Sequence, residues 1–207
     1  MEIPSKLLEE VVEHFASLPG IGRKTALRLA LNLLQKDEGS LERFGESLKS
    51  LKSRINYCTV CHNISETEMC SICSNSKRDK STICVVEDLR DVIAIESTQQ
   101  YFGTYHVLGG CISPIDGIGP DQLTISQLEK RVASGGIKEI ILALTSTMEG
   151  DTTSFYLYKK LDSDELQITS LARGVPIGNE LEFTDEITLG RSLLQRVPYK
   201  NNFSNNT

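Results

Sequence analysis

The chain has 207 residues, of which 39% are hydrophobic and 24% are charged, and these values are typical of a globular protein. No apolar run approaches the roughly 20 residues that a helix needs to cross a bilayer. The first residues also lack the apolar core of a signal peptide. The composition therefore excludes a disordered chain, predicts no membrane-spanning segment and favours a cytoplasmic location.

The net charge of −6 hides an asymmetry along the chain. Residues 1–80 carry 12 basic and 11 acidic side chains, whereas residues 81–207 carry 10 basic and 17 acidic ones. The segment 17–36 contains four bases and no acid. Because local charge decides where a polyanion docks, we expect a nucleic-acid contact in this first part of the chain.

Three helices are predicted before residue 56. Apolar residues recur at helical spacing over 3–17, 23–34 and 40–55, which is the pattern of amphipathic helices. In the third helix the apolar side chains are expected on one face, and they are Leu41, Phe44, Leu48, Leu51 and Ile55. The proline and two glycines between the first two helices predict a tight turn.

This turn has the properties of a phosphate-binding hairpin. Gly20 and Gly22 let backbone N–H groups approach an anion, because neither glycine carries a Cβ. The second helix would point its positive dipole end at the same place, and Arg23, Lys24 and Arg28 add positive charge. Such a contact would hold the DNA backbone without reading its sequence. The alternative is a plain turn between helices whose basic residues are simply solvated.

A cysteine cluster follows the helices, with the spacing Cys58-x2-Cys61-x8-Cys70-x2-Cys73. Four sulfur ligands around zinc form a closed structural site with no position left for water. The alternatives are disulfides or a redox pair, but nothing in the sequence suggests export. His62 could replace one ligand, although four thiolates already complete the shell. We therefore predict one structural zinc ion per chain, which provides the folding free energy of this segment.

From residue 81 strands and helices alternate. Apolar strands are predicted at 82–86, 106–108, 139–144 and 166–170. A helix is predicted at about 151–161, and the last helix is predicted around 185–196. This alternation is typical of an α/β fold with a mostly parallel sheet covered on both faces. The sequence Thr124-Ile125-Ser126-Gln127 is that of a helix capping box. Cys84 and Cys111 are expected to be packed thiols.

Acidic residues follow two of the predicted strands. Glu87 comes directly after the first strand, and Glu149 and Asp151 follow the strand 139–144. The carboxyl ends of the strands of an open α/β sheet are where ligands bind. The two glutamates either complement helix dipoles or belong to a partner or metal surface, and the sequence leaves both interpretations open.

These motifs together resemble a known family. The hairpin resembles the helix-hairpin-helix motif of DNA repair proteins, and Glu87 after its strand resembles the Toprim domain of topoisomerases and primases. The order of helix-hairpin-helix, four-cysteine motif and Toprim domain, with Gly109–Pro120 and Arg173–Glu182, closely resembles the RecR family of bacterial recombination mediators. The resemblance implies a helix-hairpin-helix domain (1–55), a zinc finger (56–80), a Toprim domain (81–176) and a helical C-terminal oligomerisation segment (177–207).

The resemblance also implies partners. It implies a ring-shaped homo-oligomer, often a tetramer, that clamps DNA in the bacterial nucleoid. It further implies action with RecO and RecF to load RecA at gaps coated by single-strand-binding protein. The acidic surface with Glu87 and Glu149 would then contact RecO or retain a metal.

The chain departs from catalytic Toprim domains at one position. Such domains carry an Asp-x-Asp motif, where this chain has Thr145-Ser146-Thr147. Phosphoryl chemistry with two metal ions needs several carboxylates, and hydroxyls are poor substitutes. The sequence therefore favours a non-enzymatic DNA-binding protein. The alternatives are a metal-dependent nuclease or topoisomerase-like enzyme that uses Glu87, Glu149 and Asp151, and a zinc-stabilised interaction module with no DNA role.

Overall fold

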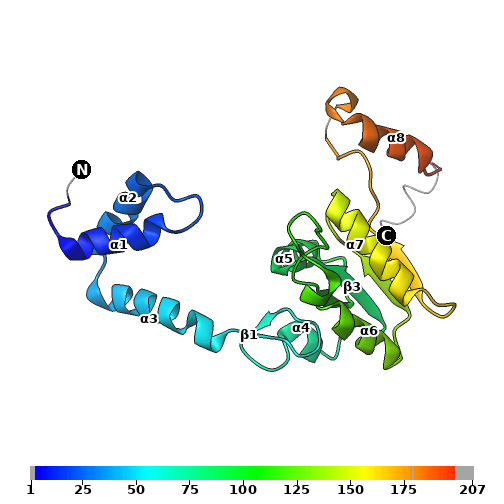
Figure 1. The fold of residues 1–207 in the computed structure, drawn as a ribbon, viewed down its shortest axis with the longest axis horizontal. Helices are drawn as coiled ribbons and strands as arrows, with labels where there is room; N and C mark the ends of the chain where they lie inside the picture. The colour runs from blue at the N-terminus through cyan, green and yellow to red at the C-terminus, as the bar shows by residue number, and fades with distance from the viewer. Residues whose placement is uncertain (1–2, 179, 199–207) are drawn as a thin grey trace. The chain divides into compact units, whose positions relative to one another are not determined.

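The computed structural model describes residues 3–178 and 180–198, and the chain divides between Asn56 and Tyr57 into two compact units. The first unit contains α1 (Lys6–Ala16), α2 (Arg23–Leu34) and α3 (Glu38–Arg54). The second contains the four-cysteine segment, a parallel sheet with its helices, and the C-terminal segment (Figure 1). All three predicted N-terminal helices are confirmed, with ends that differ by a few residues.

In the first unit, α1 and α2 pack against each other around a small apolar core (Figure 1). Ser5 caps α1, since its side chain accepts from the Leu8 amide at 3.3 Å. Val12, Ala26 and Ala30 are buried at the contact. The two alanines are small, so the two helices can approach each other closely.

The third helix differs, because none of its residues is buried. Asp37 caps it by accepting from the Ser40 amide at 2.9 Å. Its apolar side chains share one face as predicted, but they stay exposed. The exposed fractions of Leu41, Phe44, Leu48 and Leu51 are 39%, 40%, 56% and 55%. Within the described residues, α3 therefore has an apolar stripe with no core to cover it.

The boundary between the units falls within β1 (Asn56–Tyr57), which pairs with β2 (Ile64–Ser65) in a two-stranded sheet. The single-turn helix α4 (Ser71–Ser74) follows this sheet. The strands of the main sheet are β3 (Thr82–Val86), β4 (Thr104–Val107), β5 (Glu139–Leu142) and β6 (Gln167–Ser170). Its helices are α5 (Leu89–Ser97), α6 (Ile125–Ala133) and α7 (Met148–Leu161), with a 3-10 turn, η1 (Pro120–Gln122), before α6. The C-terminal segment contains η2 (Leu181–Phe183) and α8 (Glu186–Leu194).

The main sheet is parallel throughout, with the strand order β4-β3-β5-β6. Alternate residues of β3 belong to two different apolar clusters, one on each face of the sheet. Ile83 and Val85 pack with residues of α6 and α7, whereas Cys84 and Val86 pack with Val92 of α5. Burial on both faces explains the continuous apolar sequence of this strand. The predicted α/β class is therefore confirmed.

The capping-box prediction is wrong. Thr124 does precede α6, but its side chain makes no capping hydrogen bond. Its hydroxyl donates instead to the Val107 carbonyl at 2.7 Å, at the end of β4. A contact between distant segments thus replaces the local one, and no four-residue pattern could reveal it.

Two element boundaries also differ from the prediction. β4 begins at Thr104 rather than at 106, because its pairing with β3 starts there, opposite Ile83. α7 begins at Met148 rather than near 151, because the Thr147 side chain accepts from the Gly150 amide at 3.2 Å and caps the helix.

The C-terminal helix lies close to its predicted position, and Asp185 caps it by accepting from the Thr188 amide at 2.8 Å. The end of the predicted oligomerisation segment, 199–207, lies outside the described residues. In the described part of the chain, no helix is both long enough and apolar enough to cross a membrane.

Candidate zinc centre and nucleic-acid interface

The four cysteines of the predicted zinc site come together in one buried cluster. Cys58, Cys61, Cys70 and Cys73 are all at most 5% exposed, and their Sγ atoms lie within 4.8 Å of one another. The first pair lies in the loop between β1 and β2, and the second pair lies around the start of α4. The two cysteine pairs therefore converge as the spacing predicts.

Backbone amides already point at the sulfurs. The Cys70 amide donates to Cys58 Sγ at 3.3 Å, and the Cys73 amide donates to Cys70 Sγ at 3.5 Å. Burial opposes ionisation of Cys58, but amides of Cys70, Cys61 and Val60 outweigh it and lower the pKa of its thiol to about 7. The neighbouring thiol of Cys73, together with burial, raises the pKa of Cys61 far above its usual range. Only a cation can keep several thiolates together here, so the cluster fits one structural zinc ion.

His62 is not part of the sulfur cluster. Its backbone is left-handed, with φ of +60°, and its ring makes an edge contact with the ring of His106 at 5.4 Å between centroids. The ring of His62 thus packs against His106 of β4, while the four cysteine sulfurs form the cluster.

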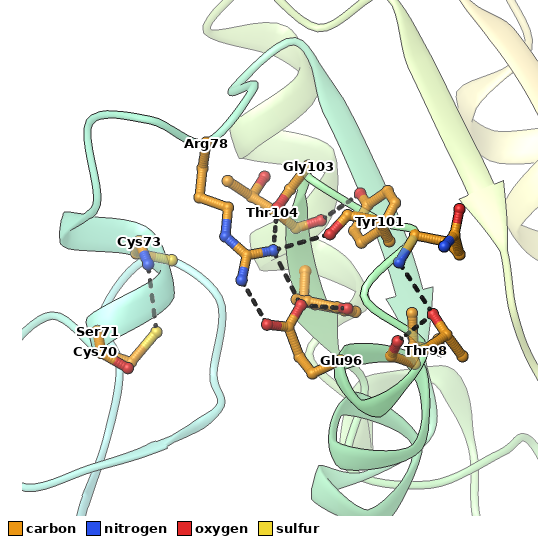
Figure 2. A network of polar contacts seen from close by, with 12 residues as sticks. Cys70, Ser71, Cys73, Arg78, Glu96, Thr98, Tyr101, Gly103 and Thr104 are labelled. Atoms are coloured by element: carbon orange, nitrogen blue, oxygen red, sulfur yellow. Dashed lines mark hydrogen bonds and ion pairs between the residues drawn. The ribbon is translucent and has the colours of Figure 1, made fainter. Parts of the chain in front are cut away.

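The four-cysteine segment is anchored to the main sheet by a polar network that Figure 2 shows. Arg78, which follows α4, forms an ion pair with Glu96 of α5, in which Nη1 donates to Oε1 at 2.9 Å. The hydroxyl of Tyr105 also donates to Glu96, at 2.7 Å. The hydrogen bonds from Arg78 lower the pKa of Glu96, although its partial burial opposes this effect. This network was not predicted from the sequence, since Arg78 and Glu96 are 18 residues apart and no short motif joins them.

The glycine hairpin joins α1 to α2 in the first unit. Gly20 has a φ of +79°, a value that favours glycine, and the Ile21 amide donates to the Leu18 carbonyl at 3.1 Å to close the turn. Gly22 is the N-cap of α2 and has no side chain to cap it. The space where a Cβ would stand is open at both glycines. The first amides of α2 are therefore accessible to an anion.

The basic residues near this turn differ in their contacts. Lys24 and Arg28 are exposed and four residues apart, so they lie on one face of α2. Arg23 instead donates from Nη2 to Glu9 of α1 at 3.0 Å. The structure thus brings the five predicted DNA-binding residues to one end of α2, but it gives Arg23 an acidic partner.

The acidic residues gather at the carboxyl end of the sheet, but they do not form a free cluster. Glu87 directly follows β3 and is half-buried. Glu149 and Asp151 lie in the first turn of α7. Both carboxylate oxygens of Asp151 accept from Arg173, one at 3.3 Å, and this contact lowers the pKa of Asp151.

Cys111 lies close to Glu87, a proximity that the sequence did not reveal. Burial and the charge of Glu87 raise the pKa of its thiol, so it is a poor nucleophile at neutral pH. Cys84 is also buried, and burial raises the pKa of its thiol to about 12. Both thiols are packed, as the sequence analysis expected.

Comparison with known protein families matches four consecutive segments of the chain. Residues 8–52 match the RecR helix-hairpin-helix, 55–75 match the RecR zinc finger domain with four cysteines, 81–172 match the Toprim domain and 174–197 match the RecR C-terminal segment. These segments contain the hairpin, the cysteine cluster, the main sheet and α8, respectively.

Curated relatives resemble the chain over nearly all of its length. A Recombination protein RecR from Bacteroides fragilis is 60% identical over 198 residues, which cover 96% of this chain and 97% of the relative. Another from Flavobacterium johnsoniae is 55% identical over 206 residues, which cover 100% of both. The order of the hairpin, the cysteines and the sheet is thus shared with proteins named for recombination.

Proposed function

The chain belongs to the RecR family of recombination proteins, and from this premise we propose that it is a non-enzymatic DNA-binding mediator of recombinational repair. A role in DNA recombination and repair agrees with its relatives. The observation that carries the DNA-binding proposal is the exposed, basic N-terminal end of α2, with open space at both hairpin glycines.

The hairpin would hold a DNA phosphate by three effects that act together. The free amides at Gly22 and in the first turn of α2 donate hydrogen bonds, and the helix dipole places partial positive charge at the same point. Lys24 and Arg28 supply full charges from one exposed face. All of these groups recognise phosphate rather than base edges, so the proposed binding is independent of sequence.

A single hairpin offers few phosphate contacts, so we propose that several act together in a homo-oligomer, in the form of a tetrameric ring. The uncovered apolar stripe of α3 supports self-association, because exposed apolar surfaces of this kind mark protein interfaces. Linking several hairpins raises their effective concentration along one DNA molecule without any new contact.

The proposed partners besides DNA are repair proteins of the RecO and RecF kind, with which the protein would load RecA at gaps coated by single-strand-binding protein. The proposed partner surface is the carboxyl end of the sheet, where Glu87, Glu149 and Asp151 gather. The contact of Asp151 with Arg173 supports this role, since it is a contact of the kind that a basic group of a partner would make there.

The non-enzymatic proposal is supported by the same surface. Thr145 and Thr147 stand where catalytic Toprim domains carry carboxylates, and Thr147 is used as the N-cap of α7. Asp151 is already paired with Arg173. Glu87 and Glu149 alone offer too few oxygen ligands for chemistry with two metal ions.

Charge reversal on the hairpin tests the proposal. The variant Lys24→Glu should bind DNA about ten-fold more weakly, and the slope of its salt dependence should fall by about one for each phosphate that the variant no longer holds. The weakening should be equal for two DNA molecules of unrelated sequence. The affinity is measured by fluorescence anisotropy at two salt concentrations.

Lys36→Glu is the matched control, because Lys36 is exposed and follows the other end of α2, and that end lies about 15 Å from Lys24 along the helix axis. The control should bind nearly as the wild type does. Equal weakening in the two variants, or a weakening in Lys24→Glu that salt does not change, would contradict the hairpin contact. Unchanged DNA retention in the double reversal of Lys24 and Arg28 would favour an interaction module without a DNA role.

A further inference from the structure

The outer edge of β4 is the part of the main sheet nearest to the four-cysteine segment. β4 is an edge strand, since β3 is its only neighbour among the described strands. The Leu108 amide donates to the Val86 carbonyl at 2.9 Å. Because backbone groups alternate in direction along a strand, those of Tyr105 and Val107 point away from β3. An edge of this kind is open to water and to foreign strands unless something covers it.

The zinc segment covers this edge at one end. The Val107 amide donates to the carbonyl of Cys61, one of the four cluster cysteines, at 2.8 Å. The residue that shapes the metal site thus also satisfies an outward backbone group of the sheet.

The chain that leaves α4 covers the other end. The Asp79 amide donates to the Phe102 carbonyl at 2.9 Å. Arg78 donates to the carbonyls of Tyr101 and Gly103 at 3.2 and 3.4 Å, and the same guanidinium is held by Glu96 (Figure 2). The outward carbonyls of Tyr105 and Val107 accept from Arg131 of α6 and from the Thr124 hydroxyl, each at 2.7 Å.

Arg78 is suited to hold this arrangement in place. Its side chain is 15% exposed and that of Glu96 is 29% exposed, so water screens the pair less than it screens a surface pair. A guanidinium can serve a carboxylate and two carbonyls at once because its five donors lie in one plane. A lysine would keep the charge but not this geometry.

We infer that Arg78 is a positioning residue that couples the zinc centre to the outer edge of β4. When the metal is removed, the four-cysteine segment releases the edge at Val107 while the rest of the sheet stays folded. The coupling is reciprocal, because two linked equilibria stabilise each other by the same factor. Breaking the contacts of Arg78 therefore weakens zinc binding, although Arg78 touches none of the four sulfurs.

The first test removes the metal from the full-length protein with a chelator and follows amide hydrogen exchange. We expect exchange at Val107 to rise about ten-fold or more, because its amide no longer has a buried hydrogen bond. Amides of β5, such as that of Ile140, should keep their protection. The inference is overturned if Val107 stays protected without metal, or if β4 and β5 lose protection together.

The second test compares zinc release to a competing chelator in Arg78→Met and Arg78→Lys. Release should be about ten-fold faster in Arg78→Met, and Arg78→Lys should lie between this variant and the wild type. The double variant Arg78→Met with Glu96→Gln should release zinc only slightly faster than Arg78→Met alone, since both substitutions break the same contact between Arg78 and Glu96.

Arg90→Met is the matched control for this test. Arg90 lies on α5, the helix that carries Glu96, and it also pairs with an acidic residue, the N-cap Asp88. Its side chain, however, is 87% exposed. It should release zinc as the wild type does. Equal release rates in Arg78→Met and Arg90→Met would overturn the inference. If Arg78→Met does not fold, Arg78→Lys alone decides, and wild-type release in that variant counts against the coupling.

Discussion

His106 lies on β4 with no exposed surface, and its Nε2 is 2.9 Å from the Thr124 carbonyl. Nε2 therefore donates, and the ring is held in one neutral tautomer. No partner for Nδ1 is found in the described part of the chain. Burial is the main reason that the pKa of His106 is lowered to about 4, and the nearby charges of Arg131 and His62 add to the effect.

This histidine makes stability depend on pH in a defined window. Its pKa is near 6.5 in the unfolded chain and about 4 in the folded one, so the unfolded state binds the proton more readily. The protein therefore keeps its full free energy of unfolding above pH 6.5, as far as this group is concerned. That free energy declines as the pH falls from 6.5 toward 4. A difference of this size corresponds to about 3 kcal/mol.

The variant His106→Phe should lose this part of the acid sensitivity, and urea unfolding between pH 7 and 4 measures it. The Thr124 carbonyl keeps a partner in the variant, since it also accepts from the Leu128 amide at 3.2 Å. His14→Gln, which replaces an exposed histidine of α1, is the control and should follow the wild-type curve. A wild-type pH profile in His106→Phe would show that His106 does not titrate as a buried group.

Among the elements, α3 is unusual because it has an apolar face but no buried residue. Leu41, Phe44, Leu48 and Leu51 recur at three- and four-residue intervals, as in helices that pair along an apolar seam. The first unit leaves this seam exposed. An amphipathic helix gains most of its stability by burying such a face, so α3 is expected to be covered in the proposed assembly.

A charge on this seam should break the assembly. Leu48→Glu should weaken self-association by about ten-fold or more, because a carboxylate at a buried contact loses its hydration. Sedimentation equilibrium measures the solution mass. Ser53→Glu adds the same charge on the opposite face of α3 and should leave the mass unchanged. An assembly that Leu48→Glu leaves intact would place the interface elsewhere.

At the scale of the whole molecule, the proposed DNA-binding and partner-binding surfaces lie on different units. The first unit presents the basic end of α2, and the second carries the zinc centre and the acidic carboxyl end of the sheet. This division agrees with the proposed binding of a polyanion by a protein with a net charge of −6, since the local field governs docking.

The acidic carboxyl end of the sheet leads to a prediction about the activity of the complete protein on DNA. Incubation with supercoiled and linear DNA and Mg²⁺ should produce no nicking, relaxation or cleavage, because the carboxylates needed for two metal ions are missing. Agarose gel electrophoresis measures the products over several hours. Activity that Glu87→Gln abolishes would instead support the nuclease or topoisomerase-like alternative.

The sequence by itself determined the helices, the parallel sheet and the cysteine cluster. Each of these rests on a local pattern, such as the 3.6-residue period of α1 or the paired spacing of Cys58 and Cys61. Local patterns survive in the tertiary structure when the same few residues provide both the signal and the contact. The hairpin glycines belong to this group, since their backbone freedom is a property of the residue itself.

Only the tertiary structure decided which side chains meet across the chain. It paired Arg78 with Glu96 and Asp151 with Arg173, and it turned the Thr124 hydroxyl from a helix cap to the end of β4. These contacts join residues 17 to 22 positions apart. Their partners are set by how the elements pack and not by sequence spacing, so a pattern along the chain cannot encode them.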